Sequence, residues 1–193
     1  MQLILASQSP RRRELLSMLG VDFAVVTAEI DETMDPGLPP EQEVARVCEA
    51  KALAVSRSHP EELVLAADTI VVLDDRVLGK PHSPEEAVQM LQSLSGRSHR
   101  VMTGFCLCRG QRLQTHVEIT TVHFRDLSEE EIRAYVATGS PLDKAGAYGI
   151  QDQAGVFVRS VEGDYYNVIG LPICPLAEQL RRQGVAVLGT VAT

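Results

Sequence analysis

The sequence predicts an α/β fold built on a mixed, twisted sheet with flanking helices. Three observations point to it. Apolar, β-branched runs alternate with helical patterns, two of the helical patterns open with capping boxes, and one pair of long strand-like runs is joined by a short turn. The chain has 193 residues, enough for one substantial core and for an elongated, two-lobed domain.

The first third of the chain is predicted to hold a strand, a helix, a second strand and a longer helix. Residues 3–6 are apolar and lead into a polar turn, after which Ser9 suits a helix N-cap and Pro10 the first helical position. We expect the second strand over residues 22–30. After a loop rich in proline and glycine, apolar spacing predicts a helix over residues 41–57.

The rest of the chain continues this alternation. Residues 63–75 are rich in β-branched and apolar side chains and predict one bent strand or a strand pair. Ser83 and Ser128 each begin a capping-box pattern, so a helix is expected after each. The other expected features are two long strands within 99–126 joined at 109–111, helix ends near Leu94 and Thr138, a strand over 155–164 and a last helix over 176–182.

Composition and charge exclude several classes of function. The chain is 45% hydrophobic and 23% charged, as in ordinary globular proteins, and its net charge is −8. A duplex-binding protein normally carries the opposite bias, so a small anionic ligand fits better than a nucleic acid. No apolar run is long enough to span a membrane, and no signal-peptide pattern is present. We expect a cytoplasmic protein that binds neither nucleic acid nor membrane.

We assign residues 1–184 to a single domain and residues 185–193 to a C-terminal tail. The four cysteines are scattered along the chain, and only Cys106 and Cys108 lie close together, in an apolar run without a second ligand pair. We interpret all four as buried reduced thiols rather than as ligands of a zinc ion.

The segment SQSPRRR at residues 7–13 predicts a phosphate-binding turn. The helix dipole disfavours arginines in a first helical turn, unless they bind an anion there. Free backbone N–H groups, the hydroxyl groups of Ser7 and Ser9, and the guanidinium groups of Arg12 and Arg13 would all complement a phosphate. The alternative is a solvated basic turn in which Ser9 serves only as a cap.

Three more segments carry candidate functional side chains. Asp68 lies inside the apolar run 66–72, where a carboxylate must be paired, metal-bound or at a strand edge; it could hold Mg²⁺, polarise water or accept backbone donors. Lys80 stands in a GKP turn, where an ordinary surface lysine is the alternative. Gln151 ends the segment DKAGAYGIQD at 143–152, which suits a base-recognition pocket or an ordinary glycine-rich turn.

These segments, with several others, match a known family in kind and in order. The matching pieces are LILASQSPRR at 3–12, IDE at 30–32, Lys51 in EAKA, AADT at 66–69, LGKP at 78–81, SGRSHRVMTG at 95–104, DKAGAYGIQ at 143–151 and GDYYNVIGLP at 163–172. On these pieces the chain resembles the Maf family of nucleoside triphosphate pyrophosphatases.

The resemblance implies a fold, a reaction and partners. The fold is a mixed-sheet α/β structure similar to that of the inosine triphosphatases, with a cleft between two lobes, and homodimers are frequent. The reaction cleaves a nucleoside triphosphate between the α and β phosphates, giving the monophosphate and pyrophosphate. It needs a divalent metal cation, Mg²⁺, Mn²⁺ or Co²⁺.

The resemblance also implies residue roles. The segments at 143–151 and 163–172 look like the branch that acts on dTTP and UTP, including modified pyrimidine nucleotides. The alternatives are the branch that prefers 7-methyl-GTP and a non-catalytic nucleotide-binding regulator of cell division and septum formation. The resemblance implies that Asp68 is the catalytic acid–base and that Arg12, Thr69 and Gln151 act in substrate choice. It matches five other residues to cleft positions: Ser7, Arg13, Glu32, Lys51 and Lys80. Together with their charges, these matches predict that Ser7, Arg13, Lys51 and Lys80 bind the phosphates and that Glu32 and Asp68 hold the metal.

A glutamine at position 151 is chemically suited to that choice. Its side-chain amide can donate to and accept from the O4/N3 edge of uracil or thymine.

Overall fold

The computed structural model describes residues 2–27, 29–33, 35 and 37–190, and these fold into two compact units. The first unit comprises Met1–Asp68, Thr103–Glu118 and Gly170–Thr193, and the second comprises Thr69–Met102 and Ile119–Ile169. Three long strands contribute residues to both units, so the chain passes between them several times.

The described residues form seven strands of one mixed sheet. Their bounds are β1 (Leu3–Leu5), β2 (Phe23–Val25), β3 (Leu63–Leu73), β4 (Arg76–Leu78), β5 (Ser98–Arg109), β6 (Arg112–Phe124) and β7 (Val158–Glu162). The strand order is β2-β1-β3-β5-β6-β7, and β4 pairs with β3. β1 is parallel to both β2 and β3, whereas β4 and β7 are antiparallel to their neighbours, which confirms the predicted mixed sheet.

The helices alternate with these strands along the chain. Their bounds are α1 (Pro10–Ser17), α2 (Pro40–Ser56), α3 (Pro84–Leu94), α4 (Glu129–Ala137), α5 (Tyr165–Ile169) and α6 (Ile173–Arg182). Three short 3₁₀ turns follow α4, at Ser140–Asp143, Ala145–Ala147 and Gln153–Phe157.

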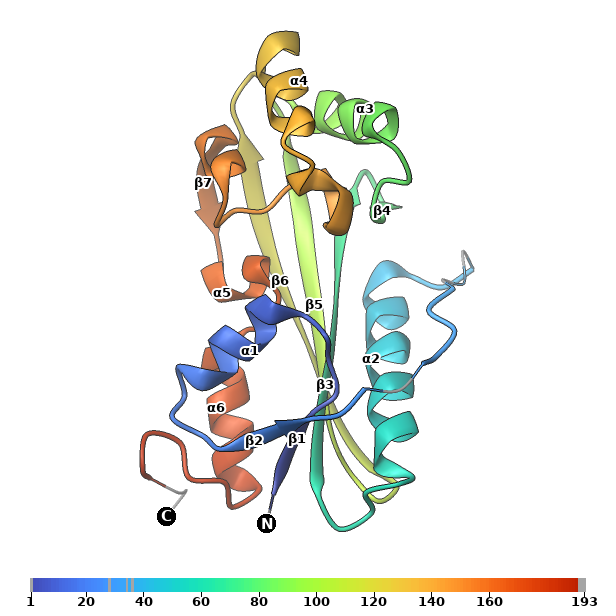
Figure 1. Cartoon of the computed structure of the whole chain (residues 1–193), viewed down its shortest axis with the longest axis vertical. Coiled ribbons are helices and arrows are strands. Elements are labelled where there is room, and N and C mark those ends of the chain that lie inside the picture. Colours follow the sequence, from blue (N-terminus) through green and yellow to red (C-terminus); the bar gives the residue numbers. More distant parts are fainter. Residues whose placement is uncertain (1, 28, 34, 36, 191–193) are drawn as a thin grey trace. The chain divides into compact units, whose positions relative to one another are not determined.

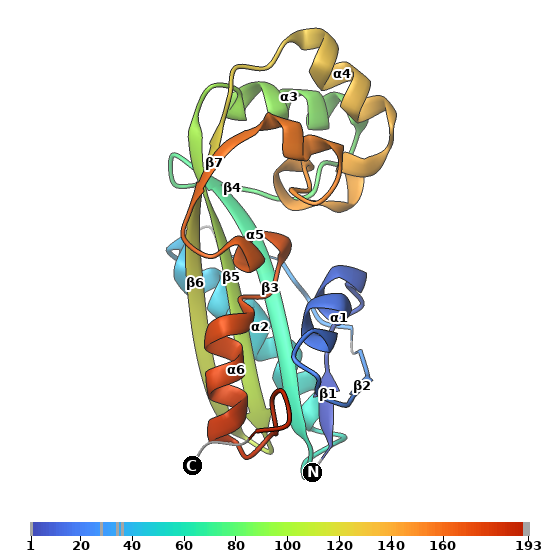
Figure 2. The same ribbon diagram turned by 90° about the vertical axis from the view of Figure 1, so that its left-hand side faces the viewer.

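In the first unit, helices cover both faces of the strands. α2 lies on one face and α6 on the other (Figures 1 and 2). The residues of β3 from Leu63 to Ala67 are therefore buried without a break, as expected for a strand covered on both sides. On α2, Cys48, Ala52 and Val55 recur at helical spacing and pack against the strands.

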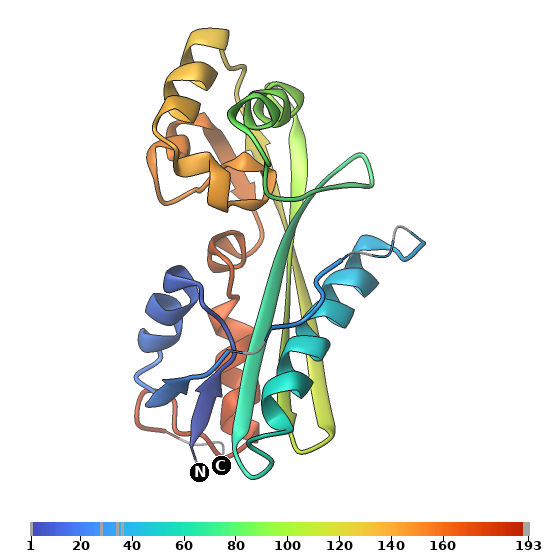
Figure 3. The same ribbon diagram turned by 45° about the vertical axis from the view of Figure 1, so that its right-hand side comes forward.

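In the second unit, α3 and α4 pack side by side (Figures 2 and 3). Their N-caps are Ser83 and Ser128, as the sequence predicts. Only Ser128 completes the capping box, because the Glu86 carboxylate accepts from the backbone N–H of His82 instead of that of Ser83. Residues from both helices share an apolar core with the 3₁₀ turns; among them are Ala87, Leu91, Leu94, Ile132, Tyr135, Ala147, Tyr148 and Phe157.

Two strand predictions were too long. Residue 28 lies outside the described residues; among the others of 22–30, the second strand covers only Phe23–Val25, because β1 beside it ends at Leu5 and leaves little backbone to pair with. The strand predicted over 155–164 begins at Val158, since the Asp152 side chain caps a 3₁₀ turn over the residues before it.

Helical structure also extends further than predicted near the C-terminal end. α5 was missed, although Asp164 accepts a hydrogen bond from the backbone N–H of Asn167 in the manner of an N-cap. α6 begins at Ile173 instead of residue 176, directly after Pro172. Beyond it, Val187 is buried and Leu188 N–H donates to the carbonyl of Leu19 at 2.9 Å. The division into one domain and a tail stays a prediction, and residues 191–193 of that tail lie outside the described residues.

Candidate active site

The alternation of β3 places Asp68 on the face that α2 covers. Val64 and Ala66 belong to the apolar cluster under α2, and Asp68 is the next residue of the same parity. On α2, Lys51 follows Cys48 by three residues and so lies on the buried side of the helix. A strand and a helix thus bring a carboxylate and an ammonium group together.

Lys51 bridges two carboxylates. Its Nζ lies 2.8 Å from Asp68 Oδ1 and 3.1 Å from Glu32 Oε1. The Lys51 and Asp68 side chains are only 15% and 18% exposed, whereas that of Glu32 is 57% exposed. The ion pair of Lys51 with Asp68 is therefore screened less by solvent than an ordinary surface ion pair. The ion pair of Lys51 with Glu32 is the more solvent-exposed of the two.

An ion pair between buried Glu43 and partly exposed Arg46, in the first turns of α2, holds the loop that carries Glu32. Glu43 is 1% exposed, and its carboxylate accepts from Arg46 Nε at 3.0 Å and from the backbone N–H of Asp35 at 3.0 Å. Arg46 also donates to the carbonyl of Thr33, the residue after Glu32, at 2.8 Å. Hydrogen bonds from Arg46 lower the pKa of Glu43, so this carboxylate stays charged.

The predicted phosphate-binding turn joins β1 to α1. Ser9 caps the helix by accepting from Arg12 N–H, and Pro10 occupies the first helical position, as predicted. Ser7 is buried, and its Oγ accepts from the backbone N–H of Ser9 and from Arg12 Nη1, both at 3.3 Å. The Ser7 hydroxyl proton remains available for an anion such as a phosphate oxygen.

Arg12 is held on both sides. In addition to its contact with Ser7, its Nε donates to the carbonyl of Gly170 at 2.8 Å. Burial lowers the pKa of Arg12, while the negative charges of Asp68 and Glu32 oppose that change. An arginine keeps its charge in proteins, so a fixed cation stands within the field of the two carboxylates. Arg13 follows it in the same helical turn and is exposed.

The other three predicted site residues belong to the second unit. Thr69 is half-buried in β3, and Lys80 and Gln151 are both exposed. The segments carrying Lys80 and Gln151 touch, because Gly146 N–H donates to the carbonyl of Gly79 at 3.0 Å.

That contact needs a glycine at position 146. Gly146 has a φ of +68°, and a Cβ atom there would lie 2.9 Å from a methyl carbon of Val71. Any side chain would therefore be strained and would push the segment away from β3.

The structure thus groups the predicted residues into two sets. Glu32, Lys51 and Asp68 make direct contacts in the first unit, and Ser7 contacts Arg12 there. The residues that support them were not predicted from the sequence: the Gly170 carbonyl behind Arg12, and the pair of Glu43 and Arg46 behind Glu32. Glu43 could have been identified, because it stands next to Val44 on the apolar side of a predicted helix, and a glutamate is rarely buried without a partner.

The cysteine prediction was wrong at one position. Cys48, Cys106 and Cys108 are buried free thiols, but Cys174 is exposed near the start of α6. Burial raises the pKa of Cys106 to about 12, so this thiol stays protonated.

Across the described residues, no group of three or more histidine, cysteine, aspartate or glutamate side chains could hold a metal ion unaided. No described helix is both long enough and apolar enough to cross a bilayer.

The fold is shared with solved structures. The structure is similar to that of the Ham1 protein of Staphylococcus aureus, with a TM-score of 0.53 and 16% identity over 95% of this chain and 100% of that one. A HAM1 protein of Coxiella burnetii gives a TM-score of 0.52 and 14% identity, over 94% of this chain and 99% of that one. At such low identity the likeness shows a shared mixed α/β architecture.

Sequence comparison defines the family. The model of the family described as "Maf-like protein" matches residues 2–183. A relative from Moorella thermoacetica is 51% identical, over 98% of this chain and 99% of its own length, and one from Geobacillus sp. (strain WCH70) is 48% identical, over 95% and 98%. Both are named dTTP/UTP pyrophosphatase. The chain belongs to the Maf family, as the sequence motifs predict.

Proposed function

We propose that this chain hydrolyses dTTP and UTP, between the α and β phosphates, to the monophosphate and pyrophosphate. The observation that carries the proposal is the bridge that Lys51 makes between Asp68 and Glu32, close to the charged guanidinium of Arg12. The near full-length relatives that bear this activity as their name support it.

The cationic residues bind the triphosphate in this proposal. Arg12 and Arg13 offer guanidinium groups at the N-terminus of α1, where backbone N–H groups also favour an anion. Lys51 and Lys80 add ammonium groups. Attack at the α phosphorus expels pyrophosphate, and positive charge close to that leaving group lowers the barrier.

Asp68 accepts the proton of the attacking water. Its carboxylate is half-buried and is held in place by Lys51, so it is fixed relative to the phosphate-binding turn of its own unit. A positioned general base of this kind typically contributes about 10²–10⁴-fold to a rate.

The donor set also suits a divalent cation. The carboxylates of Glu32 and Asp68 both lie within reach of one ammonium group, and Mg²⁺ in nucleotide enzymes is commonly held by one or two carboxylates together with substrate phosphates. Glu32 and Asp68 would hold Mg²⁺, Mn²⁺ or Co²⁺. When bound, such a cation supplies charge neutralisation and polarises water.

The base is selected by the second unit in this proposal. The Gln151 amide pairs with the O4/N3 edge of uracil or thymine, and Thr69 contributes to the same choice. A purine base presents a different edge, so GTP and 7-methyl-GTP are poor substrates. The homodimer and the cytoplasmic location stay predictions.

The test is the product and the substrate spectrum of the purified chain. With Mg²⁺ or Mn²⁺, we expect dTTP to yield dTMP and pyrophosphate, and the rates with dTTP and UTP to exceed those with CTP, GTP, dITP and 7-methyl-GTP. Release of inorganic phosphate and dTDP would place the cleavage at the wrong bond. A spectrum led by a purine would overturn the role of Gln151, and saturable binding without turnover would favour a nucleotide-binding regulator.

A further inference from the structure

Gln151 stands in a short turn whose two ends are fixed. The backbone N–H of Asp152 donates to the carbonyl of Gly149 at 3.2 Å, which closes a turn with Ile150 and Gln151 at its centre. Gln151 itself is exposed. The orientation of its amide therefore depends on how firmly the rest of the protein holds Gly149 and Asp152.

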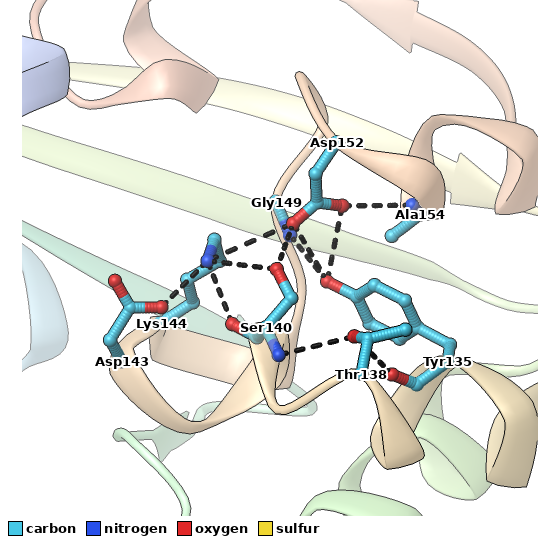
Figure 4. A network of polar contacts seen from close by, with 8 residues as sticks. All are labelled: Tyr135, Thr138, Ser140, Asp143, Lys144, Gly149, Asp152 and Ala154. Atoms are coloured by element: carbon cyan, nitrogen blue, oxygen red, sulfur yellow. Dashed lines mark hydrogen bonds and ion pairs between the residues drawn. The ribbon is translucent and has the colours of Figure 1, made fainter.

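One phenol binds both ends of this turn (Figure 4). Tyr135 on α4 donates its hydroxyl proton to the Asp152 carboxylate, whose oxygens lie 3.1 and 3.0 Å away. The same hydroxyl oxygen accepts from the backbone N–H of Gly149 at 3.3 Å. Tyr135 is 4% exposed and packs edge-on against Phe157, so its hydroxyl is fixed by its surroundings.

The Asp152 carboxylate is the hub of a larger network. It accepts from the backbone N–H of Ala154 at 2.8 Å and from Ser140 Oγ at 2.7 Å. Lys144 Nζ lies 3.7 Å from Asp152 and donates to the carbonyl of Ser140 at 2.7 Å. Burial and the charge of Asp152 raise the pKa of Tyr135, so the phenol keeps the proton that it donates.

The backbone at Gly149 lies close against the side chains of this network. A Cβ atom there would lie 2.7 Å from Lys144 Cε and 2.9 Å from Asp152 Oδ2. The turn is thus pressed directly against the network, with no side chain between them. These contacts hold the backbone on both sides of Gln151.

We propose that Tyr135 and Asp152 are positioning residues that set the nucleobase preference of this chain by fixing the turn that carries Gln151. The proposal rests on the role of Gln151 in the proposed function. Neither residue touches the nucleotide. Their hydrogen bonds hold the Gln151 amide ready to pair with a pyrimidine, and a loose turn loses that discrimination, because recognition groups must be held within a fraction of an ångström.

The test compares Tyr135→Phe with Ser128→Ala. Tyr135→Phe keeps the packed ring and removes only the hydroxyl group. Ser128→Ala removes the N-cap of the same helix, which costs stability without touching the turn. For each variant, kcat and KM are measured with dTTP and with GTP, alongside Gln151→Ala. Hydrogen exchange of the Gly149 amide provides a readout that needs no activity.

For Tyr135→Phe we expect the dTTP-to-GTP ratio of kcat/KM to fall roughly three- to tenfold, the effect of about one hydrogen bond, mainly through the KM for dTTP. The Gly149 amide should exchange faster. Asp152→Asn should lower the ratio in the same direction, and Ser128→Ala should leave it unchanged.

Two results overturn this proposal alone, and a third overturns it together with the base-reading role of the proposed function. If Gln151→Ala lowers the ratio but Tyr135→Phe does not, Gln151 reads the base without help from Tyr135. If Tyr135→Phe and Ser128→Ala lower the ratio equally, the effect is general loosening of α4. If Gln151→Ala itself leaves the ratio unchanged, the base-reading role fails, and the positioning role fails with it.

Discussion

Asp68 and Gln151 are held in place by different means. Asp68 lies in the middle of a strand, and its partner Lys51 lies on a helix packed over that strand, so backbone pairing and an apolar core fix both. Gln151 lies in a turn, which is fixed by polar contacts that reach from Asp152 to Tyr135, 17 residues earlier. One side chain depends on regular structure and the other on a hydrogen-bond network.

The difference has a physical consequence. A residue on a packed strand loses its position only when the core is disturbed, whereas a turn held by a few hydrogen bonds can be loosened by removing one hydroxyl group. We therefore expect changes near Asp68 to act on the rate with every nucleotide. Changes near Gln151 should act on the choice between nucleotides.

The largest expected effect comes from Asp68→Asn. The amide cannot accept a proton from water, so kcat with dTTP should fall about 10²–10⁴-fold, while dTTP still binds. Steady-state pyrophosphate release and equilibrium dTTP binding measure the two properties. Asp74→Asn is the matched control, because Asp74 is exposed and pairs with Arg97 at the surface. A near-normal rate in Asp68→Asn would show that another group activates the water.

Arg12→Lys should have the next largest effect. A lysine cannot make the contacts to Gly170 and Ser7 together, because it lacks the planar fork of the guanidinium group. We expect kcat/KM to fall about 10- to 100-fold with dTTP and GTP alike, the equivalent of one or two charge-assisted hydrogen bonds. Arg133→Lys, at an exposed helical ion pair, is the control. The family resemblance instead implies a part for Arg12 in substrate choice, and a change in the dTTP-to-GTP ratio would support that role against an effect on the rate alone.

Glu43→Gln tests the first unit at the loop that carries Glu32. Unlike Asp68 and Lys51, Glu32 does not lie in a strand or helix. Loss of the hydrogen bonds between Glu43 and Arg46 should reduce the free energy of unfolding by about 1–2 kcal/mol at pH 7, since Arg46 is partly exposed. The pKa of Glu43 is lowered from 4.5 in the folded protein, so the folded state binds its proton less tightly. Its contribution is therefore complete above about pH 4.5 and is lost as the pH falls through the lowered pKa.

Urea unfolding at pH 7 and pH 3 measures this difference, with exposed Glu61→Gln as the control. A stability gap between the wild type and Glu43→Gln that widened toward pH 3 would show that the ionised carboxylate is not what stabilises the loop.

The smallest effect is expected for Ser128→Ala. Removing the cap of α4 should lower the free energy of unfolding by about 1 kcal/mol, as for other N-cap serines. Thermal or urea unfolding measures it. A loss several times larger would mean that the N-terminus of α4 is coupled to the Tyr135 network.

The two regions also differ in how far the sequence predicts them. The helix after Ser9 and a strand within 63–75 follow from a cap and apolar patterns, because these signals are local; that range holds the single strand β3, and its antiparallel partner β4 lies beyond it. Asp68 was identified as a candidate because a carboxylate in an apolar run demands a partner. The partner, Lys51, came from the family resemblance, since the spacing of α2 against β3 is a tertiary property.

The supports of Gln151 could not be predicted in this way. Nothing near Tyr135 in the sequence indicates that its hydroxyl binds a turn 14 residues later. The segment 163–172 carried no readable signal for α5 as a whole or for the Gly170 carbonyl that holds Arg12. Contacts of this kind depend on how separate elements pack, which no local pattern encodes.

The most direct test of the division between chemistry and selection is pyrophosphate release from dTTP and from GTP by the wild type, Asp68→Asn and Gln151→Ala. The account predicts that Asp68→Asn lowers both rates by the same factor and keeps their ratio, whereas Gln151→Ala lowers the ratio. A changed ratio in Asp68→Asn together with an unchanged ratio in Gln151→Ala would contradict it.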